Sequence, residues 1–224
     1  MSNTAIRAVL FDFGGVVTTS PFDAFHRYEQ QRDLPDGFIQ AVNRTNPDNN
    51  AWARFERGEL TAQGFDEAFA HESRSAGHEV RGLEVVGLVY GRVRPSMVNA
   101  IKLCRGKLIT ACLTNNFRDR HVLADGSDQA DTAARDREWR EALSLFDEVI
   151  ESSRVGVRKP ETAFFELACR KLAIEPVEAV FLDDLGTNLK PARAMGMHTI
   201  KVTDPDEALA QLGTVLGMDL RAGR

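Results

Sequence analysis

The stretch that decides the fold is Ile6-Arg7-Ala8-Val9-Leu10-Phe11-Asp12-Phe13-Gly14-Gly15, close to the N-terminus. Its first part is short and mostly apolar, as expected of a strand buried in a sheet. Two glycines follow almost at once and indicate a turn. The segment therefore predicts a buried strand that delivers Asp12 to the start of a glycine turn.

Four further short apolar runs predict the rest of a sheet. They are Lys107–Leu113, Glu148–Ile150, Ala179–Leu182 and His198–Val202. Helical signals lie between them, and Pro95, Pro160 and Pro205 are each suited to the first position of a helix. Strands that alternate with helices predict an α/β fold with a doubly wound, parallel, Rossmann-like sheet.

The segment between the first two predicted strands departs from this alternation. It carries aromatic residues at mostly helical spacings and no strong strand. We expect an all-helical insertion, a cap domain over residues 18–93, whose aromatic residues form a core of their own. Residues 1–17 and 94–224 would then form the α/β core domain.

Composition narrows the classes of function. The 224 residues carry a net charge of −5 and no Lys or Arg run of the kind that makes a basic stripe, which argues against a nucleic-acid partner. No apolar stretch approaches membrane-spanning length, so no membrane partner is expected. Cys104, Cys112 and Cys169 lack paired spacing, which disfavours disulfides and structural zinc. We expect a cytoplasmic protein without a signal peptide, and a homodimer stays open.

Polar side chains follow the predicted strands where each one ends. They are Asp12, Thr114, Asn115, Asn116, Asp183 and Asp184, and Lys159 precedes the fourth strand. In an open parallel sheet, ligands bind beyond the carboxyl ends of the strands. Carboxylates from two neighbouring strand ends suit Mg²⁺, and hydroxyl, amide and ammonium groups suit a phosphate. The set therefore predicts Mg²⁺-assisted chemistry on a small phosphorylated molecule, with an aspartate as nucleophile.

Four ordered segments resemble the motifs of the haloacid dehalogenase-like superfamily of hydrolases. They are Leu10-Phe11-Asp12-Phe13-Gly14-Gly15-Val16-Val17, Leu113-Thr114-Asn115, Arg158-Lys159-Pro160 and Phe181-Leu182-Asp183-Asp184. Val180–Ala192 and the stretch from Ile150 to Pro160 are especially similar to the N-terminal phosphatase domain of soluble epoxide hydrolase. The resemblance covers essentially the whole chain, including the helical insertion. Each motif alone is weak, but four in order are specific.

The resemblance implies a role for each residue. Asp12 would be the nucleophile and a metal ligand, the Gly14 carbonyl a second ligand and Asp184 the third, supported by Asp183. The residues that would bind phosphate are Thr114, Asn115, Asn116 and Lys159; Thr114 and Lys159 would also assist Asp12 in catalysis. Asn188 is a candidate brace for the metal loop.

Gly14 departs from the family's usual pattern, because active phosphatases carry an acid/base aspartate there. Proton transfer by such a group contributes roughly 10²–10⁴-fold to rate. Three readings remain open: a phosphatase that recruits another group or water, one restricted to good leaving groups such as acyl phosphates, or a catalytically weak protein that binds a phosphorylated ligand.

A 2-haloacid dehalogenase is the alternative chemistry within the family. Such enzymes also lack the second aspartate, but they need no metal. Without a cation, Asp183 and Asp184 would repel each other and a carboxylate substrate beside Asp12. We therefore rank dehalogenation below phosphate hydrolysis.

Overall fold

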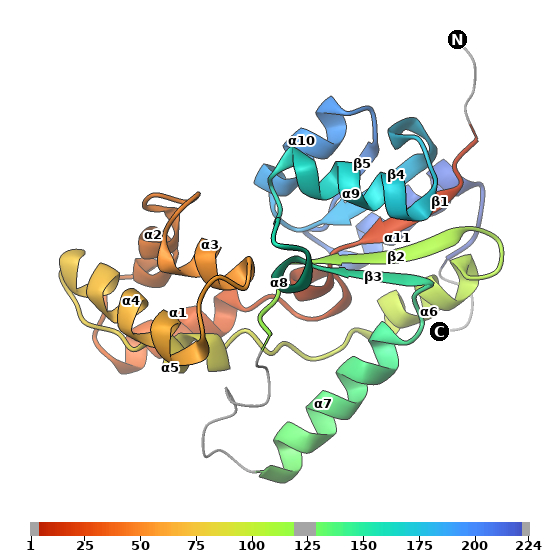
Figure 1. Cartoon of the computed structure of the whole chain (residues 1–224). Helices are drawn as coiled ribbons and strands as arrows, with labels where there is room; N and C mark the ends of the chain where they lie inside the picture. The colour runs from red at the N-terminus through yellow and green to blue at the C-terminus, as the bar shows by residue number, and fades with distance from the viewer. Residues whose placement is uncertain (1–4, 119–128, 221–224) are drawn as a thin grey trace.

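Five parallel strands form the centre of the protein. The computed structural model describes residues 5–118 and 129–220 (Figure 1). The strands lie in the order β3-β2-β1-β4-β5. Their bounds are β1 (Ala8–Phe11), β2 (Ile109–Thr114), β3 (Glu148–Glu151), β4 (Ala179–Asp183) and β5 (His198–Lys201). The predicted α/β fold with a parallel sheet is confirmed.

The register of the central strands sets where their polar residues emerge. Phe11 at the end of β1 pairs with Cys112 of β2 on one side and with Leu182 of β4 on the other. The Asp12 N–H donates to the Leu182 carbonyl at 2.8 Å, so the pairing extends into the site. Asp12, Thr114 and Asp183 therefore reach the same edge of the sheet.

Helices cover both faces of the sheet, as the doubly wound reading predicts. One face packs against α6 (Pro95–Cys104), α7 (Gln129–Leu143) and α11 (Pro205–Leu216). The other packs against α9 (Thr162–Leu172) and α10 (Gly186–Ala194). Side chains of β1 alternate between the two clusters, with Val9 and Phe11 in one and Ala8 and Leu10 in the other. This two-sided burial explains why β1 is apolar throughout.

The start of α9 differs from the sequence expectation. Pro95 and Pro205 occupy first helical positions as predicted, but α9 begins at Thr162, two residues after Pro160. Pro160 instead follows Lys159 through a cis peptide bond. A turn closes around this peptide because the Glu161 N–H donates to the Arg158 carbonyl at 2.8 Å.

Five helices fill the segment between β1 and α6. They are α1 (Phe22–Gln31), α2 (Phe38–Arg44), α3 (Ala51–Glu56), α4 (Ala62–Ser75) and α5 (Gly82–Gly87). They lie beside the sheet rather than on either of its faces (Figure 1). Their aromatic side chains form a separate buried cluster, in which Phe55 stacks on Phe65 at 4.4 Å between ring centroids. The division into a core and a cap domain at residues 18–93 stays a prediction.

One residue of the sheet side joins that aromatic cluster. Phe117, which lies beyond the end of β2, is 7% exposed and stacks on Phe55 with a centroid separation of 4.5 Å. Burying a side chain of this size stabilises a protein by roughly 1.5–3 kcal/mol. The loop after β2 is therefore attached to the helical insertion by apolar packing.

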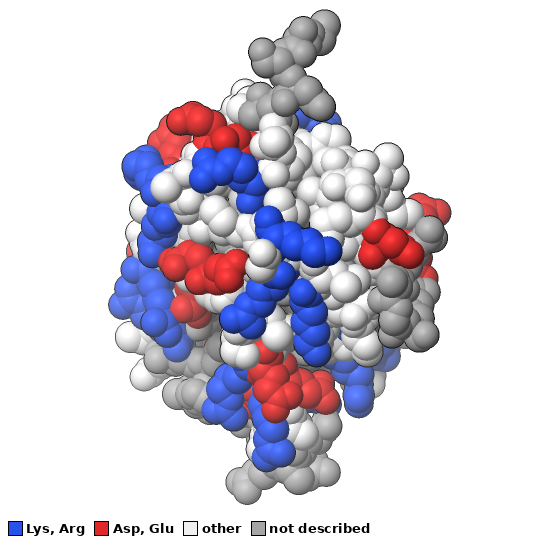
Figure 2. Space-filling model, turned by 90° about the vertical axis from the view of Figure 1, so that its right-hand side faces the viewer, with Lys and Arg blue, Asp and Glu red and all other residues white. Residues whose placement is uncertain are grey.

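The surface carries charges of both signs. Figure 2 shows Lys and Arg side chains gathered on one face of the molecule, with Asp and Glu among them. Every helix within residues 5–118 and 129–220 is too short or too polar to cross a lipid bilayer.

Candidate active site

A buried lysine joins two carboxylates at the carboxyl edge of the sheet. The Lys159 ammonium Nζ lies 2.8 Å from Oδ1 of Asp12 and 2.8 Å from Oδ2 of Asp183. Lys159 is 1% exposed, Asp12 8% and Asp183 0%. Burying a charge is costly unless it is paired, so these three groups depend on one another. The structure thus brings together three of the predicted site residues.

Burial changes the protonation of this group. It raises the pKa of the Asp12 carboxyl well above its usual value; Lys159 opposes that shift, while Asp183 and Asp184 add to it. Burial alone would lower the pKa of the Lys159 ammonium, but Asp12 and Asp183 outweigh it and hold that pKa above its usual value. The two carboxyl groups thus favour the charged form of Lys159, and three carboxyl groups surround one ammonium.

The adjacent residues Asp183 and Asp184 have different surroundings. Asp183 Oδ1 accepts from the Leu185 N–H at 2.8 Å, and both oxygens accept from the Asn188 amide at 3.0 and 3.1 Å. Together with Lys159, these donors satisfy Asp183 within the protein. Asp184 is only half-buried, and burial followed by repulsion from Asp183 raises its pKa to about 6.

Three carboxylates converge closely enough to share one cation. Asp12, Asp183 and Asp184 each offer an oxygen atom, and these atoms lie within 4.8 Å of one another. Hard carboxylate oxygens are the ligands that Mg²⁺ prefers, and a divalent ion would offset the excess negative charge around Lys159. The donor set therefore fits the predicted metal, with Asp183 already engaged by neighbours and Asp184 more available.

The turn after Asp12 contains two glycines with opposite constraints. Gly14 has φ −69° and ψ 127°, and a Cβ atom added there would meet no atom within 4 Å. Gly15 has φ +79°, and a Cβ atom there would lie 2.3 Å from Oδ2 of Asp184. Gly15 is thus required by both backbone and packing, whereas the space at Gly14 would accept a side chain.

Thr114 and Asn115 lie at the end of β2, as expected, but their side chains have different surroundings. Thr114 is 9% exposed at the strand end. The Asn115 side chain brackets the backbone of Lys159: its Oδ1 accepts from the Lys159 N–H at 2.9 Å and its Nδ2 donates to the Lys159 carbonyl at 3.0 Å. The Asn115 side chain therefore supports the lysine, and the phosphate role of its backbone N–H stays a prediction.

The Asn116 side chain is directed elsewhere. Its Nδ2 donates to Glu151 at 2.6 Å, and its Oδ1 accepts from the Ser153 hydroxyl at 2.9 Å. These contacts fasten the loop after β2 to the end of β3. They give the Asn116 amide structural partners within the protein, and the phosphate role of Asn116 stays a prediction.

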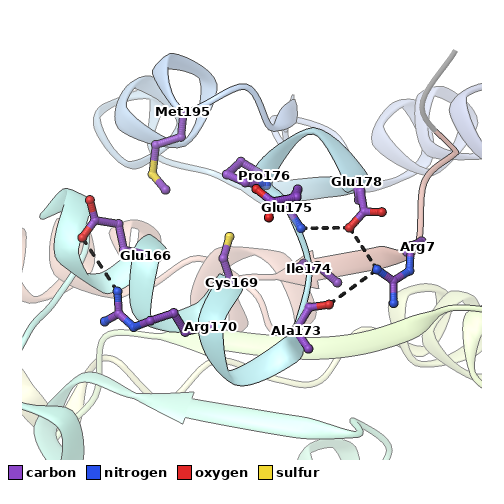
Figure 3. Close-up of a pocket in the computed structure, with 10 residues that line it drawn as sticks. All are labelled: Arg7, Glu166, Cys169, Arg170, Ala173, Ile174, Glu175, Pro176, Glu178 and Met195. Atoms are coloured by element: carbon purple, nitrogen blue, oxygen red, sulfur yellow. Dashed lines mark hydrogen bonds and ion pairs between the residues drawn. The ribbon is translucent and has the colours of Figure 1, made fainter. Parts of the chain in front are cut away.

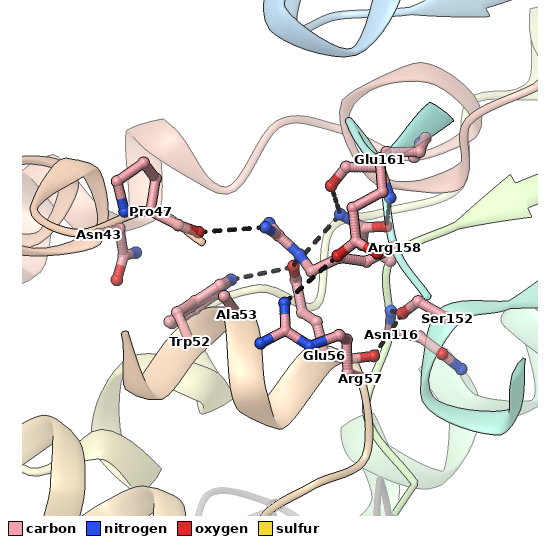
Figure 4. A network of polar contacts seen from close by, with 12 residues as sticks. Asn43, Pro47, Trp52, Ala53, Glu56, Arg57, Asn116, Ser152, Arg158 and Glu161 are labelled. Atoms are coloured by element: carbon pink, nitrogen blue, oxygen red, sulfur yellow. Dashed lines mark hydrogen bonds and ion pairs between the residues drawn. The ribbon is translucent and has the colours of Figure 1, made fainter. Parts of the chain in front are cut away.

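Sequence reasoning missed two residues next to this site. Glu56, in α3, is 7% exposed and its Oε2 accepts from Arg158 Nε at 2.6 Å (Figure 4). The same oxygen accepts from Asn115 Nδ2 at 3.2 Å. Arg158 was quoted only as part of a motif, and Glu56 sits in an ordinary helical stretch. No local pattern marks Glu56 as buried or Arg158 as its partner.

The large hollow in the surface lies away from this group. It encloses about 550 Å³ and is lined by residues around α9 and the short helix η3 (Pro176–Glu178) (Figure 3). Arg7 and Glu178, which precede β1 and β4, pair across it at 3.0 Å, so it lies at the amino ends of the strands. Arg170 pairs with Glu166 at 4.0 Å. Charges paired with one another indicate a structural role.

A parallel α/β sheet that carries carboxylates and a buried lysine at its carboxyl edge is the scaffold of a hydrolase family, and residues 6–196 match the family described as haloacid dehalogenase-like hydrolase. The chain belongs to this family. It is 38% identical over 223 residues to acyl-CoA dehydrogenase family member 10 of Mus musculus, covering 97% of this chain and 20% of that protein. It is 32% identical over 228 residues to bifunctional epoxide hydrolase 2 of Sus scrofa, covering 96% of this chain and 40% of that protein.

The chain thus spans less than half the length of these two relatives. A third relative, a sesquiterpene phosphatase of Aspergillus oryzae, is 26% identical over 220 residues, which are 96% of this chain and 98% of that protein. The predicted resemblance to the superfamily and to the epoxide hydrolase phosphatase region is confirmed.

Solved structures agree on the fold. A family enzyme from Bacteroides thetaiotaomicron, in complex with magnesium and inorganic phosphate, has a TM-score of 0.57 at 18% identity and covers 88% of this chain and 94% of that chain. L-2-haloacid dehalogenase from Xanthobacter autotrophicus has a TM-score of 0.58 at 20% identity, covering 93% and 82%. The fold is therefore shared by both chemistries, and the site residues have to distinguish them.

Proposed function

We propose that the protein is a Mg²⁺-dependent phosphatase that hydrolyses a small phosphorylated molecule through a phospho-Asp12 intermediate. The observation that carries the proposal is the convergence of Asp12, Asp183 and Asp184 around buried Lys159. Such a set binds a cation and the phosphate that accompanies it. The phosphatases among the relatives support the same chemistry.

Asp12 is the nucleophile in this proposal. Its Oδ1 accepts from the Phe13 N–H at 2.6 Å and pairs with Lys159, so we assign the attack to the other oxygen, Oδ2. A bond forms between Oδ2 and phosphorus while the bond from phosphorus to the leaving oxygen breaks. Water then attacks phosphorus, and the aspartate leaves with its carboxylate restored.

The surrounding residues neutralise and orient the phosphate. Asp12, Asp184 and the Gly14 carbonyl would hold Mg²⁺, which supplies positive charge to the phosphate oxygens. Asp183 and Asn188 keep Asp184 and the loop in place. The Thr114 hydroxyl and the Asn115 backbone N–H would donate to the phosphate, and Lys159 would offset charge on both Asp12 and the phosphate.

Gly14 limits the rate in this proposal. The leaving oxygen and the attacking water must exchange protons with solvent, because position 14 has no side chain to serve as acid or base. Substrates with good leaving groups, such as acyl and aryl phosphates, are therefore favoured. Attack of water on phospho-Asp12 becomes slow, so the phosphoenzyme should accumulate and be detectable by rapid-quench mass spectrometry.

The class of substrate and the cellular compartment are proposed from more general properties of the chain. The three cysteines are buried thiols, which supports a reducing compartment such as the cytoplasm. The charges of mixed sign in Figure 2 support a small-molecule partner over a nucleic acid. A homodimer stays a prediction.

The test is phosphate release from a panel of acyl, aryl, sugar and lipid phosphates, with and without Mg²⁺. We expect Mg²⁺-dependent release that falls by about 10³-fold or more in Asp12→Asn, because the covalent route needs a carboxylate nucleophile. Release that persists in Asp12→Asn would contradict the proposal. Chloride release from 2-chloropropionate without metal would favour the dehalogenase, and ligand-induced thermal stabilisation without turnover would favour a binding protein.

A further inference from the structure

A carboxylate from the helical insertion enters the motif loops of the sheet. Glu56 closes α3, and its Oε1 accepts from Trp52 Nε1 at 3.0 Å. Its Oε2 accepts from Arg158 Nε at 2.6 Å and from Asn115 Nδ2 at 3.2 Å. Figure 4 shows Arg158 and Trp52 converging on this side chain. Three donors on one buried carboxylate fix both of its oxygens in place.

The contact with Glu56 reinforces the orientation that the Lys159 backbone gives to the Asn115 amide. Nδ2 of Asn115 faces two acceptors, the Glu56 carboxylate and the Lys159 carbonyl, while Oδ1 faces the Lys159 N–H. A rotated amide would place its oxygen against both acceptors and its NH₂ against a donor. Glu56 therefore favours the single orientation in which Asn115 holds both ends of the Lys159 backbone.

We propose that Glu56 is a positioning residue of the active site: acting through Asn115, it fixes the backbone of Lys159 and hence the place of the lysine ammonium between Asp12 and Asp183. The inference rests on the proposed function for the role of Lys159 in catalysis. It adds that a residue of the insertion, outside the family's motifs, sets the geometry of the catalytic cation.

The surrounding contacts hold α3 firmly enough for this role. The Ser152 hydroxyl donates to the Glu56 carbonyl at 2.6 Å, and Arg57 pairs with Glu161 at 3.3 Å. Gly58 approaches the sheet side so closely that a Cβ atom there would lie 2.5 Å from the Ser153 carbonyl oxygen. Lys159 therefore takes its observed position when the end of α3 contacts the segments that carry Ser152, Ser153 and Glu161. In this way the position of the insertion affects catalysis.

The chemistry requires a carboxylate at position 56 rather than an amide of the same size. Glutamate accepts at both oxygens, and all three of its side-chain partners are donors. A glutamine offers one acceptor oxygen, so its NH₂ group would face either Trp52 or the pair formed by Asn115 and Arg158. Glu56→Gln thus disturbs this network while hardly changing volume.

The first readout is catalysis. We expect Glu56→Gln to lower kcat for p-nitrophenyl phosphate with Mg²⁺ by about 10–100-fold, the scale of a small misplacement of a catalytic group, with KM changed less than about 3-fold. Glu59→Gln is the matched control, because Glu59 pairs with Arg57 at 2.5 Å on the exposed side. This control should retain kcat.

The second readout does not depend on turnover. Amine-reactive labelling of Lys159, followed by mass spectrometry with Lys171 as internal reference, should rise about 10-fold in Glu56→Gln, the scale of a buried donor left without its acceptor. Asn115→Ala should raise the labelling of Lys159 by a similar factor. This variant replaces Glu56→Gln in the test if Glu56→Gln does not fold. Circular dichroism melts verify folding.

The two readouts separate the positioning role of Glu56 from the proposed phosphatase function. Unchanged labelling in Glu56→Gln overturns the positioning role, whether or not the wild type is a phosphatase. Raised labelling with unchanged kcat in an active enzyme overturns it as well. Raised labelling in a protein without any turnover supports the placement of Lys159 by Glu56 and overturns the proposed function alone.

Discussion

Two pairs of adjacent residues, Gly14-Gly15 and Asp183-Asp184, lie near each other at the carboxyl edge of the sheet. In each pair, one residue is confined by its surroundings and the other is not. After β1, Gly15 is confined by its backbone and by Asp184, whereas Gly14 faces open space. In the Asp183-Asp184 pair, Asp183 is satisfied by Lys159, Asn188 and a backbone N–H, whereas Asp184 is half-buried and less engaged. One member of each pair maintains the structure, and the other is left available for a ligand.

This difference shows how identical neighbours acquire separate tasks. At the end of β4, successive side chains point in different directions, so Asp183 enters the packed interior and Asp184 reaches the ligand side. In the turn after β1, the positive φ of Gly15 separates it from Gly14. The interior member tolerates little change, while the available member can be altered with gain or loss of function. Substitution of each member is therefore a direct test of the division.

The largest effect is expected where the two pairs touch. Gly15→Ala would strain a backbone with φ +79° and place a Cβ atom 2.3 Å from Asp184 Oδ2. We expect Mg²⁺ affinity to fall by about 10–100-fold, since such strain costs on the order of 1–3 kcal/mol and displaces a ligand. Calorimetric titration of Mg²⁺ into the protein, in the presence of inorganic phosphate, measures this affinity. Gly186→Ala, at an unstrained and open position, is the control; equal affinities in both variants would contradict the division.

The available glycine allows a gain of function. Gly14→Asp places a carboxyl group where the structure leaves room, at a φ of −69° that any residue adopts. We expect turnover of alkyl phosphates, which need leaving-group protonation, to rise by about 10–100-fold, toward the usual scale of general acid catalysis. Gly14→Asn fills the same space without an ionisable proton and should not reproduce the gain. Steady-state kinetics of both variants with alkyl phosphates measure the difference in turnover.

The smallest effect concerns the protonation of Asp184. Its pKa of about 6 lies above the usual 3.8, so the folded chain holds this proton more tightly than the unfolded chain. The group thus favours folding below its usual pKa and disfavours it increasingly as pH rises to about 6. Mg²⁺ offsets that penalty, and it should raise Tm by about 2–6 °C at neutral pH and by less at about pH 5. Equal shifts at both pH values, or a shift retained in Asp184→Asn, would count against Asp184 as ligand.

Much of this arrangement could be predicted because topology alone dictates it. Short apolar runs bounded by turn residues, such as that ending at Phe11 and that ending at Leu182, favour buried strands, and parallel strands deliver their last residues to one edge. Asp12, Thr114 and Asp183 therefore followed from the order of the strands. Lys159 joined the predicted set through its position before the fourth strand, but its role beside Asp12 came from the family resemblance, because nothing in its spacing shows that it is buried between two carboxylates.

The remainder depends on contacts between distant segments. Glu56 occupies an ordinary position in a charged stretch, and its burial arises only because Arg158 and Asn115 approach it from the sheet side. The contacts of the Asn116 side chain at the end of β3 were not predicted either, and its phosphate role stays a prediction. The start of α9 was misplaced, because the turn around Pro160 delays the helix by two residues. Periodicity carries no information about such lateral partners.

The stacking of Phe117 on Phe55 has a consequence for how such enzymes diversify. The loop after β2, which carries residues of the proposed phosphate site, places Phe117 among the aromatic rings of the insertion, so the two parts cannot be exchanged as independent modules. A chimaera that borrowed residues 18–93 from a distant relative would have to supply a matching ring and a matching carboxylate, or it would lose the lysine geometry along with the old specificity. New substrates are then most easily reached by gradual change in helices far from α3, with the α3 junction inherited intact.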